Sequence, residues 1–243
     1  CDKYRGGRCD LRGRPFCCQS RAMDEAAGQD HIVVREAIGP SLPLRPAAAA
    51  IVLGSLSLLM VGVMPALLGA LADSGRLSAA GIGQCATLES LAIGVSAGLC
   101  GMAAKPRHLR VFAAVATLTL ALCDFASMPA SGTMVMVLRT LAGFAEGVML
   151  WITVGMIART ETPERWAGVF WTTIVAMQLA MASAFVWVIP HLGSEGGFAA
   201  LGITALGGLA AAAWGPKSYG DLPTAPGESG APPLRGWAAL LAT

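Results

Sequence analysis

Long apolar stretches alternate with short polar segments along most of the chain. Six of these stretches approach the roughly 20 residues that a helix needs to cross a bilayer. They predict transmembrane helices over residues 47–71, 79–104, 111–128, 134–159, 163–189 and 197–214. Pro65, inside the first stretch, predicts a bend in that helix. The sequence therefore predicts an all-α protein, a polytopic membrane helix bundle with six transmembrane helices.

Composition agrees with a membrane protein. Apolar residues make up 55% of the chain and charged residues only 13%, whereas soluble domains carry about 25% charged residues. A net charge of +2 is too small to indicate a nucleic-acid partner. The seven cysteines include no C-x-x-C pair, so no metal site or cofactor is expected.

The positions of the basic residues predict the orientation in the membrane. The loops after the second and fourth stretches carry most of the loop charge, and the opposite loops hold only Arg76. Because basic residues favour the cytoplasmic side, we expect a multi-pass protein of the cell (inner or plasma) membrane with its N-terminus in the cytoplasm.

Three segments lie outside the six stretches. Residues 1–46 form a polar cytoplasmic tail, of which residues 1–22 precede the first methionine and are interpreted as either read-through of upstream sequence or a disordered extension. Residues 215–236 are rich in proline and glycine and predict a cytoplasmic linker. Residues 237–243 are apolar but too short to cross a bilayer, so we interpret them as the start of a seventh helix at which the sequence is truncated.

Two charged residues lie well inside the fourth stretch. A charge at that depth costs at least about 2.5–3.5 kcal/mol, so Arg139 and Glu146 are expected to face protein or water. They are seven positions apart and therefore share one helix face. Gly143 and Gly147 form a stripe of small residues along which another helix can approach closely.

Each of these polar residues has a functional and a structural interpretation. Glu146 is the leading candidate for ion coupling or cation recognition, because removal from water disfavours a charged carboxylate and lets it exchange a proton near neutral pH. Alternatively it is a packing residue or a partner of Arg139. Arg139 itself either lines a cavity and tunes a proton or anion site, or forms a structural ion pair with Asp124, which lies near the far end of the preceding stretch.

Three further residues are weaker candidates. Glu89 and Gln178 fall near mid-depth on the second and fifth stretches. Glu89 could bind a coupling ion, and Gln178 could donate to a substrate, although a hydrogen bond between helices is the more common role for such a residue. Trp151 could stack on a substrate or simply pack.

Local motifs carry a resemblance to a known family. The segment R-T-L-A-G-F-A-E-G, from Arg139 to Gly147, is similar to the R-x-x-x-G-x-x-x-G motif of the major facilitator superfamily. Residues 98–110 occupy the place of that family's basic loop between helices two and three, and residues 77–84 open helix two as they often do in the family. With the topology, residues 46–243 resemble the N-terminal half of such a transporter.

The resemblance implies two six-helix halves, each built from inverted three-helix repeats, with a C-terminal half missing here. It implies a secondary active transporter that moves a small solute by alternating access, with a proton as a possible coupling ion. Lys105, Arg107 and Arg110 would form its gating loop, although that loop lacks the family's acidic residue.

Other classes remain open or are disfavoured. The alternative is a non-transporting polytopic membrane protein, such as a sensor or an assembly component. The three histidines lie in tails or loops, so an enzyme is not expected. The expected partners are therefore the lipid bilayer and a small-molecule substrate, and not nucleic acid.

Overall fold

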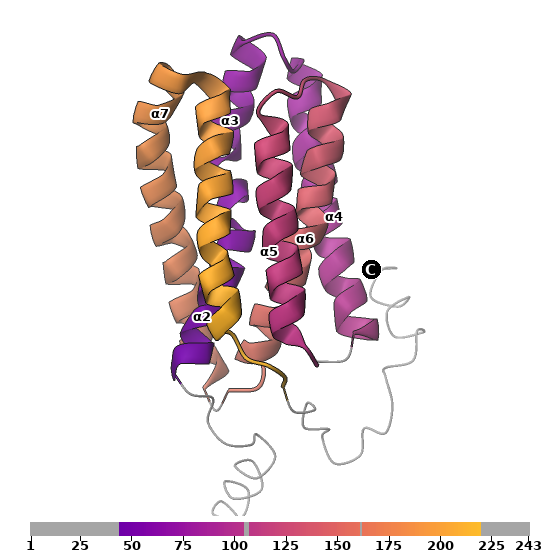
Figure 1. Ribbon diagram of the computed structural model, residues 1–243, viewed down its shortest axis with the longest axis vertical. Coiled ribbons are helices and arrows are strands. Elements are labelled where there is room, and N and C mark those ends of the chain that lie inside the picture. The colour runs from indigo at the N-terminus through magenta and orange to yellow at the C-terminus, as the bar shows by residue number, and fades with distance from the viewer. Residues whose placement is uncertain (1–43, 105–106, 161, 220–243) are drawn as a thin grey trace, which may run out of the picture. The chain divides into compact units, whose positions relative to one another are not determined.

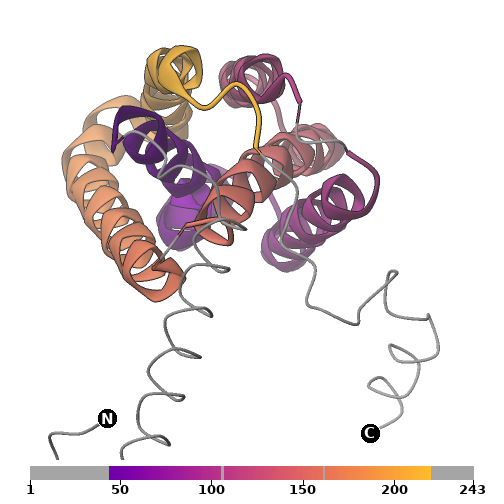
Figure 2. The same ribbon diagram turned by 90° about the horizontal axis from the view of Figure 1, so that it is seen from below.

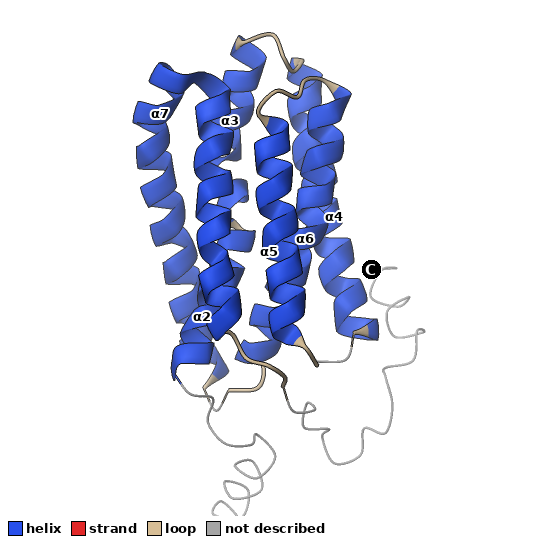
Figure 3. Cartoon of the chain, viewed as in Figure 1, coloured by secondary structure: helices blue, strands red, loops and turns tan. Residues whose placement is uncertain are grey.

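The computed structural model describes residues 44–104, 107–160 and 162–219. These residues belong to one compact unit, Leu42–Asp221, and the regular structure within them is helical (Figure 3). The predicted tail up to residue 43, most of the predicted linker and the predicted start of a seventh helix lie outside the described residues.

The helices form an up-and-down bundle (Figure 1). Their bounds are α2 Leu44–Ser57, α3 Leu59–Asp73, α4 Ala79–Ala103, α5 Leu109–Ser127, α6 Thr133–Ile157 and α7 Pro163–Trp214. Within the described residues, five helical segments are long and apolar enough to cross a membrane: α2 together with α3, then α4, α5, α6 and α7. The first four agree with the predicted stretches to within about one turn.

The last segment, α7, contains two helices, as predicted, but they meet at a kink. α7 spans 52 residues, which at 1.5 Å per residue would extend about 78 Å if straight, more than twice the hydrocarbon thickness of about 30 Å. It bends back at Gly193, where φ is 66° and ψ is −166°, a conformation that essentially only glycine adopts. The two arms, residues 163–192 and 194–214, then lie side by side (Figures 1 and 2). The expected loop between residues 189 and 197 is therefore replaced by a kink.

The first segment is interrupted at Leu58, where φ is −107° and ψ is 4°. The Nε2 group of Gln178 donates a hydrogen bond of 2.8 Å to the Leu58 carbonyl oxygen. A side chain from α7 thus satisfies a backbone acceptor at the interruption, as broken membrane helices require. The helix continues through Pro65, so the interruption lies earlier in the chain than the predicted bend.

The bundle is apolar outside and partly charged inside. Large apolar side chains such as Trp171, Val186 and Trp187 project outward from α7, whereas the charged side chains of Glu89 and Arg139 are fully buried. Apolar surface on this scale is not stable in water. The distribution is that of a helix bundle that places its apolar faces against lipid.

Candidate functional site

Four ionisable side chains meet in the interior of the bundle. Glu89 comes from α4, Asp124 from α5, and Arg139 and Glu146 from α6; each residue is at most 1% exposed. Because a charge buried in a membrane protein is costly, it persists where another charge compensates it or where function requires it. We call these four residues the charge cluster.

Glycines on α6 bring α4 close enough to reach the cluster. A Cβ atom on Gly143 would lie 2.6 Å from the Glu89 carbonyl oxygen, which is shorter than atoms of this kind approach one another. One turn later, a Cβ atom on Gly147 would collide with the side chain of Ser96. The predicted stripe of small residues therefore receives α4, and it places the Glu89 carboxylate beside Arg139.

Arg139 is held mainly by two carboxylates. Its Nη2 group donates to Oε1 of Glu89 at 2.5 Å, and its Nε group lies 3.2 Å from each oxygen of that carboxylate. Its Nη1 group donates to Oδ1 of Asp124 at 2.5 Å. Charge-assisted bonds of this kind are roughly twice as strong as neutral ones, so Glu89 and Asp124 fix the position of the guanidinium.

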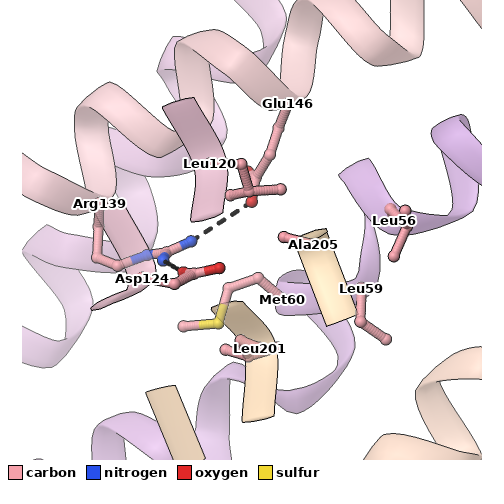
Figure 4. A pocket seen from close by; sticks show the side chains of 9 residues that line it. All are labelled: Leu56, Leu59, Met60, Leu120, Asp124, Arg139, Glu146, Leu201 and Ala205. Carbon is pink, nitrogen blue, oxygen red and sulfur yellow. Dashed lines mark hydrogen bonds and ion pairs between the residues drawn. The ribbon is translucent and has the colours of Figure 1, made fainter. Parts of the chain in front are cut away.

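Glu146 is held much less tightly. Its Oε1 atom lies 3.4 Å from Nη2 of Arg139, and its Oε2 atom is buried without a hydrogen-bond partner among the described residues. The side chain borders a cavity of about 10 Å³, close to the space that one water molecule needs. Figure 4 shows Glu146 and Asp124 at this cavity, which is otherwise lined by Arg139 and by apolar side chains.

The cluster contains more acids than bases. Three carboxylates surround a single guanidinium, so full ionisation would leave two uncompensated negative charges in the interior. Burial disfavours charge that has no partner. Positive charge is therefore favoured in the cluster, and Glu146 carries a buried oxygen, Oε2, that has no hydrogen-bond partner among the described residues.

The other predicted site residues do not join the cluster. Gln178 bonds to the backbone of Leu58, and Trp151 packs edge-to-face against Phe112 with ring centroids 6.3 Å apart. In the predicted gating loop, Arg107 is exposed and the Nε group of Arg110 donates to the Gly215 carbonyl oxygen at 2.7 Å. Lys105 lies outside the described residues.

Sequence reasoning proposed Asp124 as the partner of Arg139 but did not pair Arg139 with Glu89. The structure brings all three together. The two glycines on α6 were the available signal, since they indicate close approach of another helix; they do not say which helix approaches or at which register.

Sequence reasoning also missed the role of Arg76, which follows α3. Its guanidinium donates to the carbonyl oxygens of Ser127, Met128 and Ala130 at the end of α5, and to the hydroxyl oxygen of Ser194 at 3.2 Å. Arg76 therefore joins three ends of the bundle: the turn after α3, the end of α5 and the kink in α7.

The long apolar helices, their outward apolar faces and the buried charge cluster define a multi-pass α-helical membrane protein. No protein-family model, curated protein or solved structure matches the chain.

Proposed function

We propose that the protein is a secondary transporter that couples the movement of a small solute to the binding and release of a proton at Glu146. The observation that carries this proposal is the Oε2 atom of Glu146, which lies beside a cavity and has no hydrogen-bond partner in the described part of the chain. A passive packing residue gains nothing from a buried carboxylate oxygen that forms no hydrogen bond, because such a group costs free energy. An acid that must alternate between protonated and ionised forms requires a weakly held oxygen.

The surroundings favour a proton over a metal ion as the bound charge. Na⁺ and other hard cations require several oxygen ligands, whereas this cavity is bordered mainly by leucine, methionine and alanine side chains. A proton needs only the free carboxylate oxygen and one water molecule.

Helix interruptions beside the cavity are a second argument for the proposal. Leu56 and Leu59 flank the interruption between α2 and α3, and Leu201 and Ala205 lie on the second arm of α7; all four border the cavity. Discontinuous helices near a binding site are a recurring feature of transporters. We propose that protonation of Glu146 loosens its contact with Arg139 and allows these elements to shift.

The proposal also includes the number of membrane crossings and the place of the substrate cavity. If the two arms of α7 each cross the bilayer, the chain has six crossings with its N-terminus in the cytoplasm, as in one half of a major facilitator transporter. A substrate cavity would then form against a second six-helix half or a second copy of the chain. The substrate class is a small solute.

A flux measurement tests the proposal. The full chain is reconstituted into liposomes that contain a pH-sensitive dye, and small sugars, amino acids, organic acids and organic cations are added in turn. We expect at least one solute class to change the internal pH, and Glu146→Gln to abolish that change. The matched control is Glu195→Gln, which removes a carboxylate that is 62% exposed outside the cluster and should leave the flux unchanged.

The same measurement separates the alternatives. Solute movement with an unchanged pH profile in the Glu146→Gln protein would exclude Glu146 as the coupling residue. If no solute class moves protons, a non-transporting role as a sensor or assembly component becomes the better account.

A further inference from the structure

A second cavity lies at the end of the bundle where α2 begins and α7 ends. It is a groove of about 690 Å³, within the range of small-molecule binding sites. Its walls are made mostly of small side chains, including Ala48 and Ala49 on α2 and Gly207 and Ala211 on α7. Because these side chains fill so little space, the two helices leave a trough between them.

Two arginines and a tryptophan line the same groove. Arg45 lies in the first turn of α2, Arg110 in the first turn of α5, and Trp214 at the last position of α7. Within the described parts of the chain, no carboxylate pairs with either arginine. The bond from Nε of Arg110 to the Gly215 carbonyl oxygen holds that side chain in place.

The groove is basic at one end and apolar along the rest of its length, which matches the charged headgroup and apolar chains of a lipid. The three residues lie at helix ends, the level at which arginine and tryptophan meet the headgroup region of a bilayer. The remaining lining, from Pro46 and Val52 to the small residues of the trough, is apolar and extends from these ends along the helices. A ligand that matches it carries negative charge at one end and hydrocarbon at the other.

We propose that this groove binds one anionic phospholipid, with its phosphate between Arg45 and Arg110 and an acyl chain along the alanine and glycine wall. Basic pockets between membrane helices bind anionic headgroups in this way. The site is separate from the charge cluster, so the proposal stands or falls independently of transport.

Native mass spectrometry of the full chain tests the site. The detergent-solubilised protein is titrated with phosphatidylglycerol or phosphatidylcholine, and the dissociation constant of the first bound lipid is measured. Since each arginine near the surface adds attraction for an anionic headgroup, we expect roughly 10-fold to 30-fold tighter binding of phosphatidylglycerol. In the Arg45→Gln/Arg110→Gln protein the preference should fall below about 3-fold.

Two further variants separate the groove from general surface charge. Arg107→Gln removes an exposed arginine that does not line the groove and should keep the full preference. Ala211→Trp fills the trough and should weaken the first binding event for both lipids. Thermal unfolding of each variant checks its fold, and the single arginine variants serve if the double variant fails to fold.

The outcomes are distinct. The proposal is overturned if the preference for phosphatidylglycerol is retained in both single arginine variants and in the double variant. Equal affinity of the unmodified protein for both lipids, or an equal loss of preference in Arg107→Gln, would overturn it as well.

Discussion

Arg139 and Glu146 share one face of α6, yet 3.4 Å separates Nη2 of Arg139 from Oε1 of Glu146, and the second oxygen of Glu146 forms no hydrogen bond in the described structure. The same guanidinium lies 2.5 Å from Glu89 and from Asp124. The four residues are therefore unequal. Two acids hold the arginine closely, and the third is held weakly.

The first prediction concerns Arg139. Replacing it with methionine leaves three buried carboxylates without a cation, and removing one partner of a buried ion pair typically costs about 3–5 kcal/mol. We expect Arg139→Met to lower the unfolding temperature sharply or to abolish folded protein. Thermal unfolding in detergent measures the effect.

A second substitution shows whether the loss comes from the pairing. Glu89→Gln removes the acid that makes the most contacts with Arg139, so in the Arg139→Met background it should restore part of the lost stability. If the two effects simply add, the residues do not interact, and the role assigned to Glu89 is wrong.

The packing of α4 on α6 leads to the second prediction. A methyl group at Gly143 would lie 2.6 Å from the Glu89 carbonyl oxygen, so Gly143→Ala should push the helices apart and destabilise the protein by about 1–3 kcal/mol. Gly94→Ala on α4 is the matched control, because nothing lies within 4 Å of its added methyl group. We expect the control to be neutral or slightly stabilising. Equal effects in thermal unfolding would rule out close packing at Gly143.

Arg76 carries the third prediction. Its side chain bonds to carbonyl oxygens at the end of α5 and to Ser194 beside the kink in α7, so Arg76→Met leaves these acceptors without their donor. Losing bonds to a charged donor should cost about 1.5–3 kcal/mol. Thermal unfolding and protease cleavage near the kink both report the change.

The control for Arg76 is its acidic neighbour. Glu195 lies 3.7 Å from Nη1 of Arg76 and is 62% exposed, and exposed ion pairs contribute about 0–1 kcal/mol. Glu195→Gln should therefore have little effect. A loss as large as that of Arg76→Met would mean that the ion pair, and not the carbonyl bonds, holds the ends together.

The fourth prediction is a pH dependence outside the membrane-spanning segments. The Tyr219 hydroxyl donates to the Ile152 carbonyl oxygen at 2.8 Å. Burial raises the pKa of Tyr219 well above its ordinary value, and the nearby Arg159 offsets only part of that effect. The phenol therefore stays protonated in the folded chain under alkaline conditions.

The sign of the effect follows from where the proton is held. Below pH about 10, the ordinary pKa of tyrosine, both folded and unfolded chains keep the proton and the full stabilisation is present. As the pH rises above that value, the unfolded chain loses the proton first, so the stability falls. Tyr219→Phe should cost about 0.5–1.5 kcal/mol at neutral pH and should flatten the decline above pH about 10. Parallel curves of unfolding temperature against pH for the two proteins would contradict this role.

Much of the fold could be predicted from the sequence, because a helix that crosses a bilayer needs about 20 apolar residues. Apolar length predicted α4, α5 and α6 closely. Ser78 caps α4, since its hydroxyl accepts from the Gly81 amide at 3.0 Å, and serine is a residue type that favours this position. Thr162 holds the same position before α7 and is also of a residue type that favours it, but its side chain forms no capping bond. A serine or threonine before a helix can cap it, but the residue type alone does not ensure that the capping bond forms.

The content of the charge cluster was readable only in part. Arg139 and Glu146 share a helix face by periodicity alone, and Asp124 precedes a short turn, so these relationships follow from local geometry. Glu89 lies fifty positions from Arg139, and its contact depends on how α4 seats against the glycines of α6. The kink at Gly193 also escaped prediction, because a single glycine turns the chain where a loop was expected.

The most direct measurement of the central claim is infrared difference spectroscopy of the protein in lipid as the pH is changed. A protonated carboxylic acid has a carbonyl stretch that is distinct from the bands of a carboxylate. We predict that the protein shows such a band that appears as the pH falls, and that Glu146→Gln removes it while the variant still inserts and unfolds at a similar temperature. A band that persists unchanged in Glu146→Gln would contradict the claim that Glu146 exchanges a proton.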